Sequence, residues 1–300
     1  MRWIGPAGVV LLLAACGGAK PLPVASGPQL RKVDDFPLYE YTDRAPTPDV
    51  FVQTDTTGWA CTVFVAANSG IVGRNFDFND QPALILHHRP PGAYASVSMI
   101  DTEYLGLDRE HIDEIEPEKL GRAARIPFDG MNEKGLVVTM AQVPQARSPN
   151  QPKTTGQLGV MRLALDQAAN VDEAIAIFRK TGIDFTGDPP LHYLVADPSG
   201  ASAVIEYIDG KVHVLRDGRV ITNFTLTGST ADERAHDSRY HTASTALALA
   251  GNRLSSSQTL DLLKRVRQKI TRWSVAYDMR HRTLEVVMGQ RYGRVLRFSV

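Results

Sequence analysis

The chain is poor in cysteine, because only Cys16 and Cys61 occur among its 300 residues. Two cysteines are too few for a disulfide-stapled scaffold. A bond between them is not expected either, since Cys16 lies in a signal-like region where it would be removed or lipidated. Cys61 is therefore predicted to be a single free thiol, which calls for a chemical explanation.

The chain also lacks an excess of charge of either sign. Lys and Arg together number 33, as do Asp and Glu, and no basic stripe alternates with aromatic residues. A nucleic-acid partner is therefore not expected. With 43% hydrophobic and 22% charged residues, the composition is that of a globular protein with a sizeable core. A small-molecule substrate is expected instead.

Several common catalytic and cofactor motifs are absent from the sequence. It has no Gly-x-Ser-x-Gly elbow, no glycine-rich phosphate loop and no His-Glu-x-x-His zinc motif. His87 and His88 are adjacent, and His236 and His241 match no ligand spacing, so exposed polar histidines are the simpler interpretation. Neither a metal nor a cofactor is predicted.

The first residues carry a short apolar run rather than a membrane span. Residues 1–15 have the charged and hydrophobic regions of a secretory signal, and the run is too short to span a bilayer stably. It ends in Leu13-Ala14-Ala15-Cys16-Gly17-Gly18, which resembles a bacterial lipobox. That resemblance implies lipid on Cys16 and a protein anchored to the cell envelope, facing the periplasm or exterior. An ordinary signal peptide cut after Ala15 is the alternative.

The remaining chain shows strand and helix patterns after an irregular segment. Residues 16–60 are predicted as a tether and pro-segment, because residues 17–48 are rich in Pro, Gly, Ala and Asp with little periodicity. Residues 61–300 are predicted as one domain. Strands are expected at 62–67 and 71–73, which form a hairpin, and at 136–140, 193–196, 203–207, 212–215, 220–222, 273–277, 284–288 and 295–300. Helices are expected at 160–168, 170–182, 238–249 and 259–270. This alternation indicates an α+β layered domain.

The residues around Cys61 suggest how its thiol is activated. A thiol of pKa about 8.5 is a weak nucleophile at neutral pH unless a cation or a base favours the thiolate. The hairpin brings Arg74 back towards Cys61, and Asp77 lies three residues further on. No histidine sits in a Cys-His signature near Cys61, although a pair assembled only in the fold stays open. Cleavage between Ala60 and Cys61 would instead free an α-amine of pKa about 8, which can take the proton of its own thiol.

Five short motifs follow one another in this part of the chain. They are Cys61-Thr62, Gly73-Arg74-Asn75-Phe76-Asp77, Phe128-Asp129-Gly130-Met131-Asn132-Glu133-Lys134-Gly135-Leu136, Ile221-Thr222-Asn223 and Ser238-Arg239-Tyr240. In this order they resemble the motifs of the choloylglycine hydrolase family. This group of N-terminal-nucleophile hydrolases includes bile salt hydrolases, penicillin V acylases and, more distantly, acid ceramidase. The resemblance covers residues 61–300, about four fifths of the chain.

The resemblance implies a fold, a reaction and a set of site residues. The fold is a four-layer αββα sandwich of two antiparallel sheets flanked by helix pairs. The reaction is hydrolysis of a linear amide bond in a small N-acyl substrate, through an acyl-enzyme formed after autocatalytic cleavage before Cys61. By resemblance, Cys61 is nucleophile and base, and Arg74 tunes the thiolate. Asp77 orients the α-amine, Asn223 donates to the oxyanion, and Arg239 supports the charged network.

One position departs from the family pattern. Where the family commonly has a second oxyanion asparagine, this chain has Met140-Ala141-Gln142-Val143-Pro144. Gln142 is expected to substitute for that asparagine, with a longer side chain that is harder to aim.

Other interpretations stay open. Taken alone, Cys61 is also typical of a buried structural thiol, and Arg74 and Asp77 are typical of a surface pair. Asn223 is also typical of a strand-end cap, and Arg239 of a solvated helix residue. Their coincidence in order favours an amide hydrolase, while an acyltransferase of the same fold and a non-catalytic envelope lipoprotein remain alternatives.

The acyl and amine groups of the substrate are not defined by the sequence, and bile conjugates, penicillin V, acyl-homoserine lactones and fatty-acid amides all stay open. Tyr104, Leu105 and Leu107 are candidates to line an apolar acyl pocket, with core packing as the alternative.

Lipid on Cys16 and cleavage before Cys61 conflict, because the cut would leave only residues 16–60 on the anchor. Seven apolar residues of that segment are available to dock it on the body: Phe36, Leu38, Tyr39, Tyr41, Val50, Phe51 and Val52. A membrane-associated complex of two fragments is therefore predicted. A homo-oligomer is also compatible with the sequence.

Overall fold

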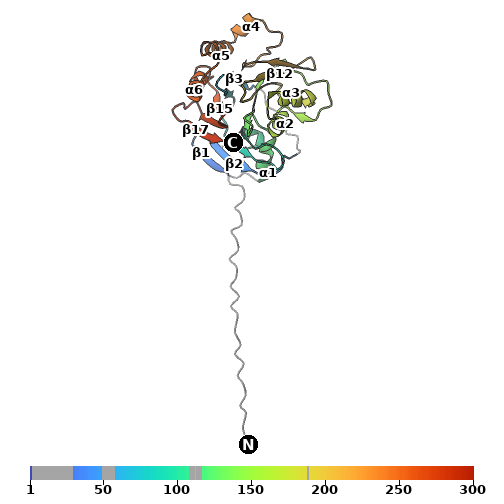
Figure 1. Ribbon diagram of the computed structural model, residues 1–300, viewed down its shortest axis with the longest axis vertical. Helices are drawn as coiled ribbons and strands as arrows, with labels where there is room; N and C mark the ends of the chain where they lie inside the picture. Colours follow the sequence, from blue (N-terminus) through green and yellow to red (C-terminus); the bar gives the residue numbers. More distant parts are fainter. Residues whose placement is uncertain (2–29, 49–57, 108–111, 113–116, 188) are drawn as a thin grey trace.

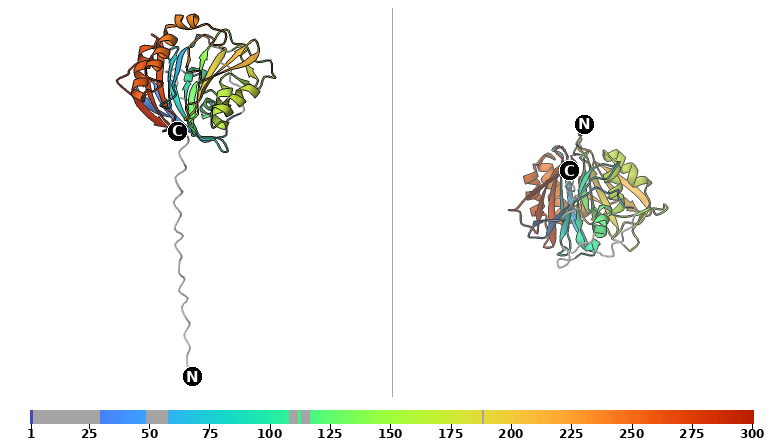
Figure 2. Two further views of the ribbon diagram at one scale, coloured as in Figure 1. Left: turned by 45° about the horizontal axis from the view of Figure 1, so that its top comes forward. Right: turned by 90° about the horizontal axis from the view of Figure 1, so that it is seen from below.

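Two β-sheets face each other in this protein, and a pair of helices covers the outer surface of each sheet (Figures 1 and 2). The computed structural model describes residue 1 and residues 30–48, 58–107, 112, 117–187 and 189–300. The four-layer α+β sandwich expected from the sequence is confirmed.

Among the described residues, the larger sheet has nine strands in the order β1-β2-β5-β6-β7-β8-β11-β12-β13. Their bounds are β1 Arg31–Asp34, β2 Leu38–Asp43, β5 Ala83–His88, β6 Ser96–Asp101, β7 Asp129–Asn132, β8 Val137–Gln142, β11 Leu191–Ala196, β12 Ser202–Ile208 and β13 Lys211–Arg216. In the same ranges the smaller sheet has six strands in the order β14-β3-β4-β15-β16-β17. These are β14 Val220–Ile221, β3 Ala60–Ala66, β4 Ile71–Asp77, β15 Thr271–Asp278, β16 Thr283–Met288 and β17 Leu296–Ser299. β9 Thr155–Gly156 and β10 Ile183–Asp184 form a separate pair.

The helices lie on opposite outer faces of the sandwich. α2 Gly159–Gln167 and α3 Val171–Lys180 contact the nine-stranded sheet, whereas α5 Ser238–Leu249 and α6 Ser256–Arg265 contact the six-stranded sheet. In Figure 2 the yellow-green and orange-red helices accordingly lie on the two sides of the strands. Shorter helices are α1 Pro117–Arg122 and α4 Ala231–His236, with 3-10 turns η1 Thr102–Leu105 and η3 Ala123–Arg125. The larger apolar core fills the space between the sheets and beneath α2 and α3.

Side-chain caps explain where two of the predicted helices begin. Asn170 caps α3 by accepting a hydrogen bond from the Glu173 N–H, as its sequence position predicted. The helix predicted at 259–270 is shifted towards the N-terminus. Ser255 and Gln258 form a capping box that begins α6 at Ser256, and the helix ends at Arg265. Ile270, the last residue of the predicted range, follows the helix and is 51% exposed.

Part of the segment before Cys61 belongs to the sandwich. β1 and β2 form one edge of the nine-stranded sheet, and β2 pairs in parallel with β5 from Leu38 opposite Ala83 to Asp43 opposite His88. This departs from the all-antiparallel sheet expected above. The reason is that the β3-β4 hairpin of the other sheet separates β2 from β5 in the chain, and such a crossover permits parallel pairing. Cys16, Val50, Phe51 and Val52 lie outside the described residues.

Side chains reinforce this edge. Leu38, Tyr39 and Tyr41 are each at most 5% exposed. The Asp34 carboxylate forms ion pairs with Arg291 and Arg294 near the C-terminus of the chain. Within the described ranges, no helix is both long and apolar enough to cross a membrane.

Candidate active site

The β3-β4 hairpin positions the predicted nucleophile and its arginine. Cys61 lies opposite Phe76 and Val63 opposite Arg74, so Cys61 and Arg74 share the face that points towards the nine-stranded sheet. Arg74 Nη2 is 3.7 Å from Cys61 Sγ, and Nη1 donates to the Met140 carbonyl of β8 at 2.6 Å. The structure thus brings Arg74 to the thiol, as the hairpin predicted.

The charge of Arg74 is balanced by Asp129 on β7. Arg74 Nε lies 2.7 Å from Asp129 Oδ2, and both side chains are fully buried. Tyr277 and Trp273 donate hydrogen bonds to the same carboxylate. Burial raises the pKa of Asp129, while the charge of Arg74 and these two donors lower it. Sequence reasoning gave Asp129 no role, although its place in the third motif was a usable signal.

The Cys61 thiol is fully buried in the uncut chain. Burial raises its pKa to about 11, although the charge of Arg74 acts in the opposite direction. The nearby carboxylates of Asp77 and Asp129 raise the pKa further. Arg74 alone therefore does not give a thiolate at neutral pH, and the thiol needs a base to become a nucleophile.

Asn223, in the loop after β14, bonds to residues on both sides of the predicted cleavage point. Its Oδ1 accepts from the Cys61 N–H at 3.0 Å, and its Nδ2 donates to the carbonyls of Trp59 at 3.1 Å and Gln142 at 2.9 Å. Arg239, in the first turn of α5, donates to the Cys61 carbonyl at 2.7 Å and to Asn223 Oδ1 at 3.0 Å. The amide of Asn223 is thereby held in one orientation beside the bond.

Asp77 lies beside this network at the end of β4. Its carboxylate accepts from Thr271 and, at 2.9 Å, from Gln268, and lies 3.9 Å from Arg239 Nη1. Burial raises the pKa of Asp77, and the hydrogen bonds from Thr271 and Gln268 oppose that rise. With the Ala60–Cys61 peptide bond intact, the Cys61 nitrogen is an amide that donates to Asn223. The role of Asp77 in orienting a free α-amine therefore stays a prediction.

Gln142 closes the site from β8. Its side-chain Oε1 accepts from the Gly58 N–H at 3.0 Å, while its backbone carbonyl accepts from Asn223. In the uncut chain its amide therefore holds the residues that precede Cys61. Six predicted residues gather around residues 58–61 through the contacts described here: Cys61, Arg74, Asp77, Gln142, Asn223 and Arg239.

A buried pair that sequence reasoning missed supports the Asn223 loop. His192 Nε2 lies 2.9 Å from the Thr222 carbonyl, and Nδ1 lies 3.1 Å from Glu206. Glu206 also accepts from the backbone N–H groups of Leu226 and Thr227 at 2.7 Å. Burial raises the pKa of Glu206, but these bonds outweigh it and bring the pKa to about 2. No local motif joins His192 to Glu206, because the pair forms only when β11 and β12 align.

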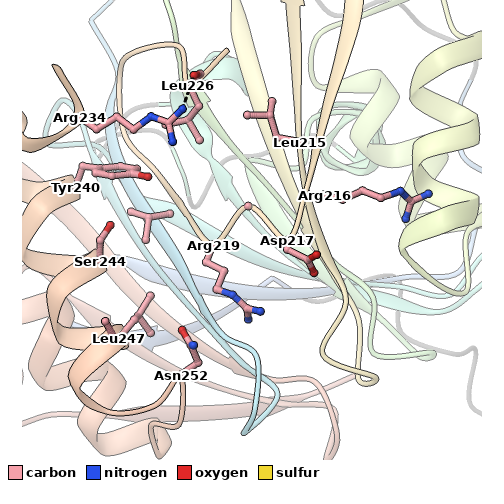
Figure 3. Close-up of a pocket in the computed structure, with 13 residues that line it drawn as sticks. Leu215, Arg216, Asp217, Arg219, Leu226, Arg234, Tyr240, Ser244, Leu247 and Asn252 are labelled. Carbon is pink, nitrogen blue, oxygen red and sulfur yellow. Dashed lines mark hydrogen bonds between the residues drawn. The ribbon is translucent and has the colours of Figure 1, made fainter. Parts of the chain in front are cut away.

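A surface pocket of about 370 Å³ lies beside Leu226 (Figure 3). Leu226 lines it together with Arg219 and with Arg234 and Tyr240 from α4 and α5. None of the six predicted site residues is among its lining residues. Across the described residues, no group of three or more His, Cys, Asp or Glu side chains could hold a metal ion.

Comparisons with known proteins bear on the family. Residues 61–225 match the family of linear amide C-N hydrolases, choloylglycine hydrolase family. A penicillin V acylase from Pectobacterium atrosepticum is 33% identical over 110 residues, which are 32% of this chain and 29% of that acylase. The match therefore spans less than a third of the length of this relative.

Solved structures support the same fold. A variant of a conjugated bile acid hydrolase from Clostridium perfringens has a TM-score of 0.58 at 14% identity, over 81% of this chain and 92% of that one. A penicillin V acylase from Agrobacterium tumefaciens has a TM-score of 0.55 at 18% identity, over 80% and 86%. At these identities the likeness concerns the fold alone. Because the family match covers more than half of the residues, the chain belongs to the choloylglycine hydrolase family of linear amide C-N hydrolases.

Proposed function

We propose that the protein hydrolyses a linear amide bond of a small N-acyl substrate through an acyl-enzyme on Cys61, after cutting its own chain before Cys61. One observation carries the proposal: Asn223 bonds to the Cys61 nitrogen and to the Trp59 carbonyl, across the bond to be cut. The family supports amide chemistry. The position of the thiol beside Arg74 supports Cys61 as the nucleophile.

The first reaction is self-cleavage. Cys61 Sγ attacks the carbonyl carbon of Ala60, the C–N bond breaks, and the Cys61 nitrogen leaves as an amine that carries the thiol proton. Water then hydrolyses the thioester and leaves a carboxylate on Ala60. Arg239, which donates to the Cys61 carbonyl at 2.7 Å, holds the new N-terminal residue in place.

The second reaction is hydrolysis of the substrate. The α-amine of Cys61 accepts the thiol proton, Sγ attacks the substrate carbonyl, and the proton passes to the leaving nitrogen as the amide bond breaks. Asn223 Nδ2 stabilises the oxyanion once the Trp59 carbonyl no longer occupies it, with Gln142 as the second donor. Water then releases the acid from the thioester and restores the thiol.

Intact-mass measurement and a substrate panel test this proposal. The purified protein should begin at Cys61, and one or more of a bile salt, penicillin V, an acyl-homoserine lactone and a fatty-acid amide should release amine. Transfer of the acyl group to an added amine in preference to water would favour the acyltransferase. An intact Ala60–Cys61 bond with no turnover would favour the non-catalytic lipoprotein and would sink the proposal.

We infer in addition that Cys16 carries lipid and anchors the protein in a bacterial cell envelope, and that the cut segment stays on the body. Docking is supported by the pairing of β2 with β5 and by the buried Leu38, Tyr39 and Tyr41. It is also supported by His87 and His88 of β5, which contact Glu40 and Asp43 of β2 at 3.0 Å. The enzyme would then remain at the membrane as two fragments.

A further inference from the structure

The side chain of Trp59 fills an aromatic chamber next to the nucleophile. The residue is 2% exposed, and its ring centroid lies 5.1 Å from Phe128, 5.5 Å from Tyr104, 6.2 Å from Phe76 and 6.3 Å from Phe78. Its indole Nε1 donates to the Tyr104 hydroxyl at 2.7 Å. Edge-to-face packing and a satisfied indole N–H make this a specific site for a large ring.

The chemistry identifies what this chamber is for. In self-cleavage the acyl half of the bond is the chain that ends in Trp59 and Ala60, and it becomes a thioester on Cys61. In substrate hydrolysis the acyl half of the substrate becomes the thioester on the same sulfur. The two acyl groups therefore use the same space beside Sγ, and Trp59 marks where an acyl side group lies.

The contacts of residues 58–60 are those of a ligand held at both ends. Gly58 N–H donates to Gln142 Oε1, and the Trp59 carbonyl accepts from Asn223 Nδ2. Asn223 Nδ2 is the oxyanion donor assigned above, whereas Gln142 holds Gly58 through its side-chain oxygen. A peptide that occupies Asn223 Nδ2 and the acyl chamber together excludes a substrate from both.

Cleavage frees this peptide from Cys61 but not from the molecule. Nine residues, 49–57, connect it to the segment that contains β1 and β2, of which β2 is paired to β5. A ligand tethered through a short linker reaches an effective concentration on the order of millimolar. The cut end is thus retained close to the site it has left.

We propose that residues 58–60 act in the cleaved enzyme as a tethered product that competes with substrate, and that the chamber they fill selects compact aromatic acyl groups over long linear ones. The proposal rests on the function proposed above. Phe78 also lines a surface pocket of about 430 Å³ together with Thr271. Substrate binding then consists of exchanging one aromatic group for another.

Kinetics of the fully cleaved protein test the competition. Wild type, Trp59→Ala, Trp59→Phe and the exposed-site control Lys32→Ala are compared on phenylacetyl and decanoyl amides of one chromogenic amine. We expect Trp59→Ala to lower KM for the phenylacetyl amide about tenfold with little change in kcat, Trp59→Phe to fall between, and Lys32→Ala to match wild type. The phenylacetyl amide should have the higher kcat/KM in each. Added N-acetyl-Gly-Trp-Ala should inhibit Trp59→Ala competitively and wild type several-fold less.

The outcomes separate this proposal from the function on which it rests. Complete cleavage and amide turnover with equal KM in wild type and Trp59→Ala would overturn the tethered competitor. A preference for the decanoyl amide would overturn the assigned acyl class. Absence of both cleavage and turnover in wild type would instead overturn the proposed function.

If Trp59→Ala is not cleaved, tryptophan fluorescence tests whether Trp59 is displaced. Phenylacetate added to cleaved wild type should red-shift tryptophan emission, with Trp59→Phe as the blank. An unchanged spectrum would contradict displacement.

Discussion

The strand pair β1-β2 and the three residues 58–60 both precede the predicted cut, but different kinds of contacts hold them. The strand pair is held by a backbone ladder, buried apolar side chains and the ion pairs of Asp34, far along the chain from Cys61. Residues 58–60 are held by Gln142, Asn223 and an aromatic chamber, which are groups of the site itself. One part of the segment therefore serves the fold, while under the proposed function the other has to leave before a substrate can bind.

Replacing Cys61 should leave the strand pair and residues 58–60 joined to the body in one uncut chain. In Cys61→Ala we expect no self-cleavage and no amide turnover, because the thiol is required in both reactions. The fold should remain, at a cost of about 1 kcal/mol for loss of one small buried group. Intact mass, amine release and thermal unfolding measure the three effects. Turnover near the wild-type rate would contradict the mechanism.

Removing the Asn223 amide should slow chemistry strongly. We expect Asn223→Ala to reduce kcat by an amount equivalent to about 3 to 4 kcal/mol, the usual effect of losing an oxyanion donor, with a smaller change in KM. Self-cleavage should slow as well, since Asn223 bonds to both Cys61 and Trp59. Single-turnover rates and the time course of intact mass test this. A change confined to KM would argue against the role.

Loosening the strand pair should affect retention without affecting chemistry. Leu38→Ala removes a fully buried side chain of β2, which typically costs about 2 to 5 kcal/mol. In the cleaved protein, the segment should then separate from the body at a lower urea concentration than in wild type. Size-exclusion chromatography and membrane fractionation measure this, with the exposed Lys32→Ala as the matched control.

Cys61→Ala provides the second control. Its uncut chain should stay with the membrane at every urea concentration at which the lipid on Cys16 remains inserted in the membrane. A wild-type body that is soluble without denaturant would show that the segment does not hold it. In that case lipid on Cys16 would serve delivery only.

Gln142→Ala should give the smallest effect. Its side chain contacts the Gly58 N–H, and its length makes it a looser oxyanion donor than an asparagine. We expect kcat to fall by roughly tenfold or less, equivalent to at most about 1.4 kcal/mol. Pre-steady-state acylation rates of Gln142→Ala and Asn223→Ala, compared side by side, test the ranking. Equal losses would show that both amides contribute alike.

Much of the sandwich could be predicted because its signals are local. The hairpin around Asn68-Ser69-Gly70, the capped helix at Asn170 and the meander β11-β12-β13 each depend on residues close in sequence. β5 and β6 were missed, and β2 was placed in a tether, because β2 pairs with β5 and β6 pairs with β7, strands that are distant in the chain.

The candidate site likewise combines contacts that are local in sequence with contacts that form only when the sheets assemble. Cys61, Arg74 and Asp77 lie on one hairpin, so their proximity followed from its register. The balance of Arg74 by Asp129, the support of the Asn223 loop by Glu206 and the burial of Trp59 needed the assembled sheets. The pKa of the Cys61 thiol could not be foreseen either, since burial outweighs the charge of Arg74.

The parallel pairing of β2 with β5 also bears on solubility. β5 reads Ala-Leu-Ile-Leu-His-His, and without β2 its backbone N–H and C=O groups would form an open, apolar sheet edge. Such an edge is a template for pairing with another copy of the chain and for fibril growth. β1, which forms the actual edge, instead exposes Arg31 and Lys32, and charged side chains discourage that pairing. If the chain is cut as proposed, the segment shields the body from aggregation for as long as the two fragments stay together.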